Sequence, residues 1–359
     1  MKILRIINTL KTGGAERSIE TNVPVHNSHG YNTDVLVLNG QQTPFMDNLE
    51  KDGVRLIKLS GLSLYNPLQA LRIIKYIKGY DIVHVHLFPA FYWAALAKVL
   101  SCRKVKLVYT EHSTSNHRRG RIFFRVVDRL VYRCYDRIIA ISPAAKENLV
   151  KHIGREDGIV VVENGVNLKP FISQKEVISL FPGSDKSFIV TQVASFRFPK
   201  DQDTVIRAMS KTAENVHAVF VGIGDRMDEC KNLATDLGVA DRVHFLGGRM
   251  DIPAIVRSSS VVVMSSSYEG FGRAAIEGMA GSKPVIGSDV AGLRDLVKGA
   301  GILFNVGDDK SLAGHIERLR TDEEYYDTIA VACFERSKEY SSEKMIEGYE
   351  AIYNELMSK

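Results

Sequence analysis

The segment that decides the fold is SYEGFGRAAIEGMAGSKPVIGSD, from Ser267 to Asp289. It follows the apolar, β-branched run Val261 to Met264, which is typical of a buried strand, and two glycines then precede a helical pattern over Arg273 to Ala280. Open α/β sheets bind ligands at the carboxyl ends of their strands, so Glu269 is expected to lie at such a site. Glu277 follows eight residues later and can face the same space from the helix.

These two carboxylates suit a polyhydroxylated ligand. A carboxylate accepts hydrogen bonds from two neighbouring hydroxyl groups at once, as in a ribose diol. The helix that begins near Gly272 directs backbone N–H groups and the positive end of its dipole into the same space, and glycine there lets a phosphate approach. The alternative is that Glu277 is a solvated helix residue and Glu269 a helix cap.

Strand-like runs of Val, Ile and Leu alternate with helix-length segments along the whole chain. This pattern indicates parallel sheets buried on both faces and a doubly wound α/β architecture. Strands are expected at 2–8, 34–38, 55–59, 82–86, 106–110, 137–141 and 159–162, and then at 188–193, 217–221, 243–246, 260–264, 284–287 and 302–304. The segment Gly165 to Ser187 carries two prolines, two glycines and no clear strand, so we expect it to link two domains.

Composition is that of a soluble enzyme. At 359 residues, with 45% hydrophobic and 25% charged residues, the chain can form two domains that each bury a core. The four cysteines have neither metal-ligand spacing nor a disulfide pattern, which favours a reducing cytosol. The amino-terminal sequence MKILRIINTL lacks the long apolar region of a signal peptide, and no apolar run approaches the roughly 20 residues that span a bilayer. We expect a cytoplasmic protein.

Charge is unevenly distributed along the chain. Residues 1–165 carry 24 Lys and Arg against 14 Asp and Glu, a net charge of +10, whereas residues 166–359 carry 23 against 28, a net charge of −5. Arginines recur at intervals of four in the first half, and two more precede them: Arg118, Arg119, Arg121, Arg125, Arg129, Arg133 and Arg137. On a helix they would form one basic stripe interleaved with apolar residues.

Such a basic amphipathic helix is typical of proteins that lie on anionic membranes. We therefore expect peripheral membrane contact. The alternative is a solvated helix face partly paired with Asp128 and Asp136. No nucleic-acid reader motif accompanies the basic surface, so nucleic acid is not an expected partner.

Nine segments follow one another in a characteristic order. They are GGAER (13–17), DIVHVH (81–86), TEHS (110–113), ISPAAKENL (141–149), ENGVN (163–167), VASFRFPKDQD (193–203), VGIGDR (221–226), FLGGRMDIP (245–253) and EGFGRAAIE (269–277). With the Glu-x7-Glu spacing of the last segment, the chain resembles the retaining glycosyltransferases of the GT-B fold, in particular glycosyltransferase family 4. The match spans nearly the whole chain.

The resemblance implies two Rossmann-like domains facing across a cleft. Residues 1–165, with a carboxyl-terminal helix at about 342–359, would form the acceptor-side domain, and residues 166–341 the donor-binding domain. The implied reaction transfers a sugar from a nucleotide-diphosphate sugar, with UDP as the default, to a glycan or lipid-linked acceptor. The implied pathway is cell-envelope polysaccharide biosynthesis, such as lipopolysaccharide or capsule. The family generally needs no catalytic metal, so no cofactor is expected.

The resemblance also assigns catalytic residues. Lys200 would contact the donor phosphates, and Glu269 the hydroxyls of the transferred sugar. The family's partner arginine is replaced by Ser195, and Arg197 is the candidate that would reach a phosphate instead, the alternative being a surface salt bridge. His112 would lie near the reacting carbon, the alternative being a structural histidine.

The remaining donor-binding residues implied by the resemblance are Gly14, Gly222, Gly224, Arg249, Met250, Phe271, Gly272, Arg273 and Glu277. Glu277 would hold the ribose, and Arg249 and Met250 would meet the base. Arg273 departs from the aliphatic residue often found at its position. Gly14 would let its loop close on the diphosphate or acceptor, although a simple strand-to-helix turn also needs a small residue.

Two other sequence features are interpreted without a ligand. His84 and His86 resemble a metal pair on one strand face, but no third ligand is apparent, so we interpret them as packing or polar-network residues. VGIGDR lacks the third glycine of a dinucleotide fingerprint, which argues against a dehydrogenase.

Other functions remain open at this point. A GT-B epimerase or phosphorylase would share the architecture. A non-catalytic adaptor that only binds nucleotide sugar is favoured by one feature, Ser195.

Overall fold

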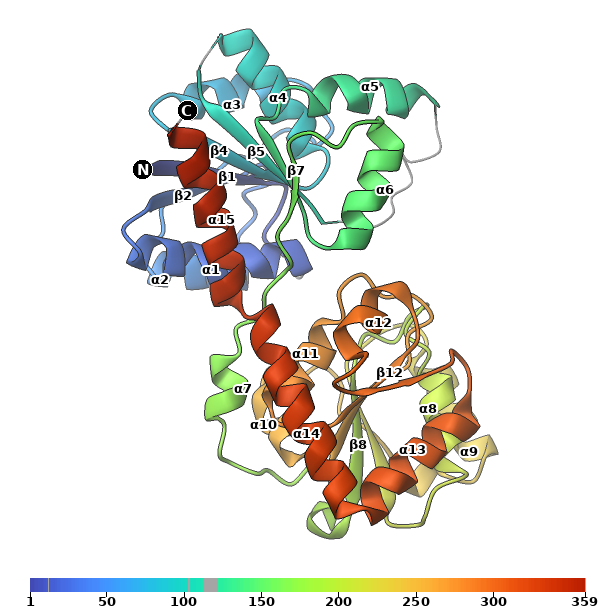
Figure 1. Ribbon diagram of the computed structural model, residues 1–359. Helices are drawn as coiled ribbons and strands as arrows, with labels where there is room; N and C mark the ends of the chain where they lie inside the picture. The colour runs from blue at the N-terminus through green and yellow to red at the C-terminus, as the bar shows by residue number, and fades with distance from the viewer. Residues whose placement is uncertain (12, 103, 113–121, 359) are drawn as a thin grey trace. The chain divides into compact units, whose positions relative to one another are not determined.

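The computed structural model describes residues 1–11, 13–102, 104–112 and 122–358 and divides into two compact units (Figure 1). The first unit consists of Met1–Gly165 and Ser342–Lys359, and the second of Val166–Ser341. Each unit is built on one sheet of parallel strands with helices on both faces. The predicted doubly wound α/β class is confirmed.

The first sheet has seven strands in the order β3-β2-β1-β4-β5-β6-β7. They are β1 (Lys2–Ile7), β2 (Asn32–Val37), β3 (Leu56–Lys58), β4 (Ile82–His86), β5 (Lys106–Glu111), β6 (Arg137–Ala140) and β7 (Ile159–Val161). All seven predicted strands are present, and β4 has the predicted ends. The central strands are buried on both faces, which explains their continuous apolar runs.

Among the described residues, seven helices cover this sheet, in two layers. They are α1 (Gly14–Ser28), α2 (Pro44–Lys51), α3 (Gln69–Ile77), α4 (Ala90–Ser101), α5 (Ile122–Tyr132), α6 (Pro143–Ile153) and α15 (Ser342–Met357). Side chains of α1, α2 and α15 pack on one face, and those of α3, α4, α5 and α6 on the other (Figure 1). This division follows from the alternation of side chains along each strand.

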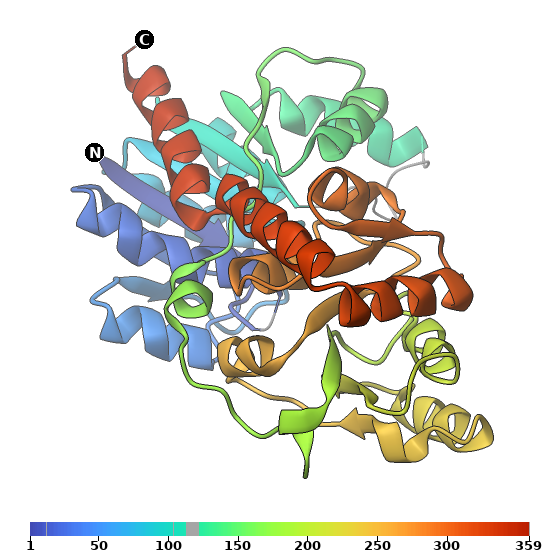
Figure 2. The same ribbon diagram turned by 60° about the horizontal axis from the view of Figure 1, so that its bottom comes forward.

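The carboxyl-terminal helix α15 is a structural part of the first unit (Figure 1, Figure 2). Tyr349 and Tyr353 are fully buried against β1 and β4. The Tyr353 hydroxyl lies 2.5 Å from Nδ1 of His84 and accepts a hydrogen bond from the buried Arg5 at 3.4 Å. Helix α15 therefore supplies Tyr353 to a polar network inside the first unit.

The basic stripe predicted across five arginines is wrong in its second half. Helix α5 ends at Tyr132, so Arg133 lies beyond it, and Arg137 is the first residue of β6, where it pairs with Glu355. The buried run that follows Arg137 forms strand β6. The four-residue spacing of the arginines therefore continues past the end of α5 in the sequence, but the arginines no longer share a helix face. Arg125 and Arg129 are exposed on α5.

The acidic partners proposed for this stripe are also engaged elsewhere. Asp128 is buried and bonded to Tyr92 and His152, and Asp136 pairs with Lys98 at 2.8 Å. Arg118, Arg119 and Arg121 lie outside the described residues.

The second sheet has six strands in the order β10-β9-β8-β11-β12-β13. They are β8 (Phe188–Val193), β9 (Val216–Val221), β10 (Val243–Phe245), β11 (Val261–Met264), β12 (Val285–Ser288) and β13 (Ile302–Phe304). Its helices are α7 (Lys169–Ser173), α8 (Gln202–Met209), α9 (Met227–Asp236), α10 (Ile252–Ser258), α11 (Arg273–Ala280), α12 (Ala291–Val297), α13 (Asp309–Thr321) and α14 (Glu323–Ser337). All six predicted strands are present, and α11 has the predicted ends.

The predicted linking segment contains no strand among its residues, all of which are described. It forms α7 and a short 3-10 turn at Ser184–Lys186. Phe171 and Phe181 are buried against the second unit, and the Phe181 ring stacks on His244 with centroids 3.8 Å apart. The segment is therefore anchored to the second unit near Phe171 and Phe181, whereas most of residues 172–177 are exposed.

Candidate functional site

Two loops of the second unit meet where the strand order reverses. Strands β8 and β11 are neighbours, yet the strands that follow each of them continue to opposite sides of the sheet. The Ser265 hydroxyl donates to the Asp201 carbonyl oxygen at 2.6 Å, and the Gln192 amide donates to the Lys200 carbonyl oxygen at 2.9 Å. Open α/β sheets bind ligands in the crevice at such a point. The loops after β8 and β11 therefore form the candidate site.

Lys200 and Glu269 form an ion pair at this point. The Lys200 ammonium donates to Oε2 of Glu269 at 2.5 Å, and the two side chains are only 19% and 14% exposed. Oε1 of Glu269 accepts from the Gly270 N–H at 3.1 Å. Glu269 is not a helix cap, because Gly272 occupies the N-cap position of α11. The structure thus brings together the two side chains that the sequence assigned to phosphate and sugar.

Helix α11 begins beside this pair, at a glycine. Gly272 has φ +73°, in the left-handed region, and a Cβ there would lie 2.5 Å from Cδ2 of Leu293. The left-handed backbone favours glycine, and any side chain there would also displace the end of Leu293. The first N–H groups of α11 have no acceptor inside the helix, so the positive end of its dipole points into the loop region that Phe271 and Gly272 form.

Glu277 lies one turn along α11 and is largely shielded from solvent. Its side chain is 13% exposed, and Oε1 accepts from Nε of Arg273 at 2.8 Å. The reading of Glu277 as a solvated helix residue is therefore wrong. Arg273, the departure from the family pattern, fixes the position of this carboxylate.

Sequence reasoning missed Gly292, which holds the Glu269 loop in place. A Cβ at Gly292, in the first turn of α12, would lie 2.0 Å from the carbonyl oxygen of Glu269 and 2.5 Å from its carbonyl carbon. Only glycine allows this approach. The signal in the sequence was a glycine inside a helical pattern, which marks close packing in many proteins.

Arg197 lies on the loop after β8, two residues beyond Ser195. Its backbone N–H donates to the Ser195 carbonyl oxygen at 3.0 Å, and its side chain is exposed. Within the described residues its guanidinium forms no ion pair, so the alternative of a surface salt bridge finds no partner there. The guanidinium is available to an anion.

Gly222 and Gly224 follow β9 and have a structural reason to be glycine. A Cβ at Gly222 would lie 2.0 Å from the carbonyl oxygen of Ala194, and one at Gly224 would lie 2.3 Å from that of Phe196. These contacts pack the loop after β9 against the loop after β8. Their predicted contact with the donor remains a prediction.

Large apolar side chains are exposed on four successive loops at this edge of the sheet. They are Phe198, Ile223, Met250 and Tyr268, on the loops that follow β8, β9, β10 and β11. Of these four, only Met250 was expected at the site from the sequence. Ligand sites combine apolar walls with a few polar groups, and these side chains supply such walls. Neighbouring Arg249 is paired with Asp251 through two hydrogen bonds.

The chain contains an Asp-x-Asp sequence at Asp201 to Asp203, a pattern that elsewhere binds divalent cations. Here the Asp203 carboxylate accepts two hydrogen bonds from Arg226, both at 2.9 Å, and Asp201 accepts one from the Thr204 hydroxyl at 2.6 Å. Burial raises the pKa of Asp201. Both carboxylates are thus committed to the start of α8. Within the described residues no group of three or more potential ligands is arranged to hold a metal.

In the first unit, His112 follows β5 and joins a buried histidine row. Its Nε2 lies 3.0 Å from Nδ1 of His86, and the His86 ring lies 4.3 Å from that of His84. His84 is bonded at both nitrogens, to Tyr353 and to Thr110 at 2.6 Å. The interpretation of His84 and His86 as polar-network residues is confirmed.

Burial, with the Arg5 guanidinium nearby, lowers the pKa of His112 to about 4. Burial likewise lowers the pKa of His84 and His86 well below the usual value. His112 is therefore neutral at physiological pH. Since its Nε2 faces His86, only Nδ1 and the backbone carbonyl of His112 remain for a ligand.

Gly14 is the first residue of α1, with Gly13 at the N-cap position. A Cβ at Gly14 would meet no described atom within 4 Å, whereas one at Gly13 would lie 2.0 Å from Oε2 of Glu16. The N-terminus of α1 therefore has open space at Gly14. Its predicted closure on a diphosphate or acceptor remains a prediction.

Two parallel-sheet units, one of them with a candidate site at its strand-order reversal, have the architecture of glycosyltransferases of the GT-B fold. A solved structure with the same fold is Anabaena Alr3699/HepE in complex with UDP, at a TM-score of 0.87 and 23% identity over 99% of this chain and 100% of that chain. Residues 12–169 match the family model Glycosyltransferase Family 4, and residues 166–332 match Glycosyl transferases group 1. The chain belongs to glycosyltransferase family 4.

Curated relatives span most of the chain. An uncharacterized glycosyltransferase of Methanocaldococcus jannaschii is 30% identical over 265 residues, which cover 68% of this chain and 67% of the relative. N-acetyl-alpha-D-glucosaminyl L-malate synthase of Bacillus anthracis is 27% identical, covering 77% and 75%. UDP-Gal:alpha-D-GlcNAc-diphosphoundecaprenol alpha-1,3-galactosyltransferase of Escherichia coli is 27% identical, covering 84% and 83%.

The buried histidines predict that the first unit loses stability in mild acid. Burial lowers the pKa of His26 to about 2, in addition to the lowered values of His84, His86 and His112. Below about pH 6.5 the unfolded chain binds protons at these positions that the folded chain does not. The free energy of unfolding should therefore fall by up to about 1.4 kcal/mol per pH unit for each such histidine.

The loss from His112 should end near its folded pKa of about 4. Urea unfolding between about pH 7 and about pH 5, followed by the fluorescence of Trp93, measures the effect in the first unit, since Trp93 is the single tryptophan of the chain. A constant free energy of unfolding over this range would contradict the buried, neutral state of these rings.

The Gly292 contact predicts that Gly292→Ala displaces the Glu269 loop. The new methyl group overlaps a backbone carbonyl, so we expect a loss of about 1–3 kcal/mol in the free energy of unfolding of the second unit. Gly314→Ala is the matched control, because its Cβ would lie in open space on α13, and it should be neutral or stabilising by up to about 1 kcal/mol. Equal stability of the two variants in denaturant titration would refute the role of Gly292.

Proposed function

We propose that the chain is a retaining glycosyltransferase that moves a hexose from a nucleotide-diphosphate sugar, with UDP favoured, to a hydroxyl group of a glycan or lipid-linked acceptor in cell-envelope polysaccharide biosynthesis. The observation that carries the proposal is the Lys200–Glu269 pair beside the start of α11. The E. coli relative, whose name specifies a UDP-galactose donor and a diphosphoundecaprenol-linked acceptor, supports the donor and acceptor classes.

The ion pair suits a ligand that carries phosphate and hydroxyl groups side by side. Cleavage of the bond between the anomeric carbon and the phosphate oxygen leaves negative charge on the diphosphate. The Lys200 ammonium can exchange the Glu269 carboxylate for a phosphate oxygen, and the released carboxylate can accept from sugar hydroxyl groups. The Arg197 guanidinium and the N–H groups at Phe271 to Arg273 add further positive charge without reorganising the fold.

The rest of the donor can occupy the same edge of the second unit. Arg273 holds Glu277, whose carboxylate would accept from the two ribose hydroxyl groups. The exposed apolar side chains of the neighbouring loops, Met250 among them, offer a surface for the base, with Arg249 beside it. Gly222 and Gly224 keep the loop between these groups close to the sheet.

His112 of the first unit is assigned to the sugar end of the donor. Positive charge develops on the anomeric carbon as the leaving group departs. A neutral imidazole or a backbone carbonyl can stabilise that charge, whereas an imidazolium would oppose it. The lowered pKa of His112 supports this role.

We infer that transfer needs no metal ion. Lys200, Arg197 and the start of α11 can neutralise the leaving diphosphate, and the Asp201 and Asp203 carboxylates are already bonded within the protein. No cofactor is assigned.

We also infer that the protein acts in the cytoplasm, at the inner face of the cytoplasmic membrane. The net charge of +10 in residues 1–165 and the exposed Arg125 and Arg129 on α5 support contact with anionic lipid. Among the described residues, no helix combines the length and the apolar character needed to cross a bilayer.

The proposal predicts a selective thermal shift. Nucleotide diphosphates and their sugars, added without metal, should raise the Tm of the second unit by about 5–11 °C at 100 times the Kd, and UDP-sugars should do so most. Glu277→Ala should abolish the shift, because the ribose loses its acceptor, whereas Glu214→Ala, at an exposed position away from the site, should retain it. Absence of a shift with every nucleotide would refute the donor site.

The proposal also predicts a catalytic defect in Lys200→Ala. Loss of the ammonium beside the leaving phosphate should lower kcat for UDP release by about 100- to 1000-fold, while Lys211→Ala, paired with Asp309 on the surface, should behave as wild type. Wild-type activity should survive EDTA. Abolition by EDTA would refute metal independence, and nucleotide binding with no transfer to any acceptor would favour the adaptor suggested by Ser195.

A further inference from the structure

The outward face of α3, α4 and α5 exposes an unusual number of large apolar side chains. These helices are neighbours on one face of the first sheet (Figure 1). The exposed residues are Tyr65, Leu68, Leu71, Leu96, Val99, Leu100, Val126 and Leu130, with 37% to 66% of each residue accessible. On α4 they fall at spacings of three and four, and on α5 at a spacing of four, so each set lies along one side of its helix. We call these eight residues the apolar face.

The apolar face has basic borders and carries no acidic residue among those described. Residues 69–133 contain thirteen Lys and Arg but only three Asp and Glu. Of these three, Glu111 and Asp128 are buried, and Asp81 is exposed in the turn before β4, beside Lys78, Lys104 and Lys106 at the border and away from the eight apolar residues. The exposed basic residues described around the face are Lys75, Lys78, Lys104, Arg125, Arg129 and Arg133.

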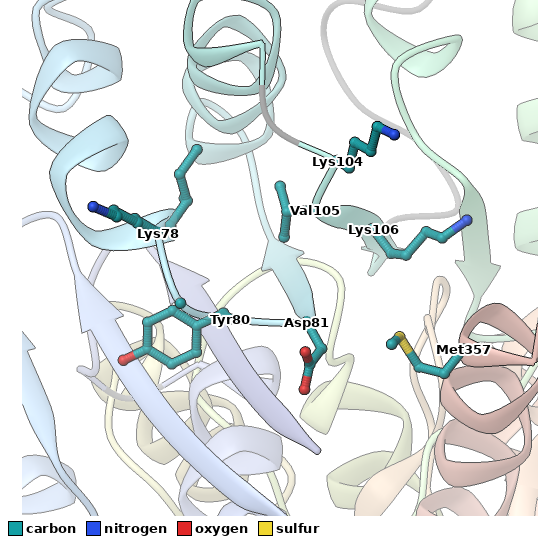
Figure 3. A pocket seen from close by; sticks show the side chains of 9 residues that line it. Lys78, Tyr80, Asp81, Lys104, Val105, Lys106 and Met357 are labelled. Carbon is teal, nitrogen blue, oxygen red and sulfur yellow. The ribbon is translucent and has the colours of Figure 1, made fainter.

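Lys78 and Lys104 lie just beyond the carboxyl ends of α3 and α4. Figure 3 shows them with Lys106 around the amino ends of β4 and β5, close to Met357. Lysine at a helix carboxyl end also complements the helix dipole. The ammonium groups of Lys78 and Lys104 can still bind an anion from solution while they complement the helix dipoles.

The opposite side of the same unit differs. The helices α1, α2 and α15 contain eight acidic residues between them, such as Glu20, Glu50 and Glu343, and Met357 is their only exposed large apolar residue among those described. Exposed apolar area in the first unit is therefore concentrated on one face, together with positive charge. A monomer in water rarely exposes such a combination without a partner.

Buried contacts hold the three helices as one platform. Asp128 of α5 accepts from the Tyr92 hydroxyl of α4 and from His152 of α6, the latter at 2.8 Å. Trp93 of α4 donates from its indole nitrogen to the Leu64 carbonyl oxygen at 2.7 Å, which fixes the loop before α3. The apolar face is thus preformed.

We propose that the apolar face docks on an anionic lipid bilayer, with side chains of α3 and α4 entering the boundary between headgroups and acyl chains. Apolar residues bounded by basic residues, with no exposed acid between them, match the two attractions that such a surface offers. The proposal extends the membrane contact beyond the basic residues of α5, and it rests on the proposed function in assuming a membrane-bound acceptor.

The test is binding to vesicles of phosphatidylcholine and phosphatidylglycerol, measured by cosedimentation. The triple variant Leu71→Ser, Val99→Ser, Leu100→Ser should bind at least ~10-fold more weakly than wild type, because three inserted side chains are lost. The double variant Ile172→Ser, Val331→Ser is the matched control, since it removes equally exposed apolar residues of the second unit, and it should bind as wild type.

Trp93 supplies an internal probe of the orientation. It is the single tryptophan and lies on α4. Brominated lipids should quench its fluorescence in the wild type and in the control, but far less in the triple variant. Lys75→Gln, Lys78→Gln, Lys104→Gln should weaken binding at low salt and have little effect on pure phosphatidylcholine.

Three results would overturn the proposal. The first is equal vesicle binding by the wild type and the triple variant, and the second is vesicle binding without quenching of Trp93 fluorescence. The third is a wild-type protein that is dimeric without lipid while the triple variant is monomeric. The thermal shift with nucleotide sugars should be unchanged in the triple variant. A failure of vesicle binding with that shift intact would therefore refute the docking surface alone, and a missing shift in the wild type would refute the proposed function alone.

Discussion

The whole structure depends on one constraint, which is that a parallel sheet must be covered on both faces. The first sheet meets it with segments from both ends of the chain, since α15 packs on β1 and β4 through Tyr349 and Tyr353. The second sheet uses residues 178–181, which precede the 3-10 turn before β8, to cover β9 and β10. Parallel connection also aligns the carboxyl ends of all strands, so the loops that carry function share one edge in each unit.

Most of the fold could be predicted from the sequence because buried parallel strands leave continuous apolar runs. β4, β8 and β13 have the predicted ends, and α11 begins and ends as expected. The basic stripe failed because an interval of four is a helix signal only while the chain stays helical. The helix ends at Tyr132, and Arg137 begins a strand. The turn between them ends the helix, and the spacing of the charged residues does not predict where that turn falls.

The site was predictable in its charged residues and not in its supporting ones. Glu269 and Glu277 stand out because their spacing follows a strand and a helix, whereas Lys200 was expected only from the resemblance to family 4. Gly292 does not, because its importance comes from the Glu269 backbone, which is distant in sequence and meets it only in the fold. The exposed Phe198 and Tyr268 were missed for a related reason, since an apolar residue in a loop looks like a core residue until its accessibility is known.

The Lys200–Glu269 pair has a consequence for selectivity. An anion such as inorganic phosphate that binds Lys200 alone leaves the Glu269 carboxylate without a cation in a largely shielded place, which is unfavourable. A ligand that brings an anion and hydroxyl groups together satisfies both side chains. Under the proposed function, molecules that offer only one of these features should compete poorly, because binding would require both partners of the ion pair to be replaced at once.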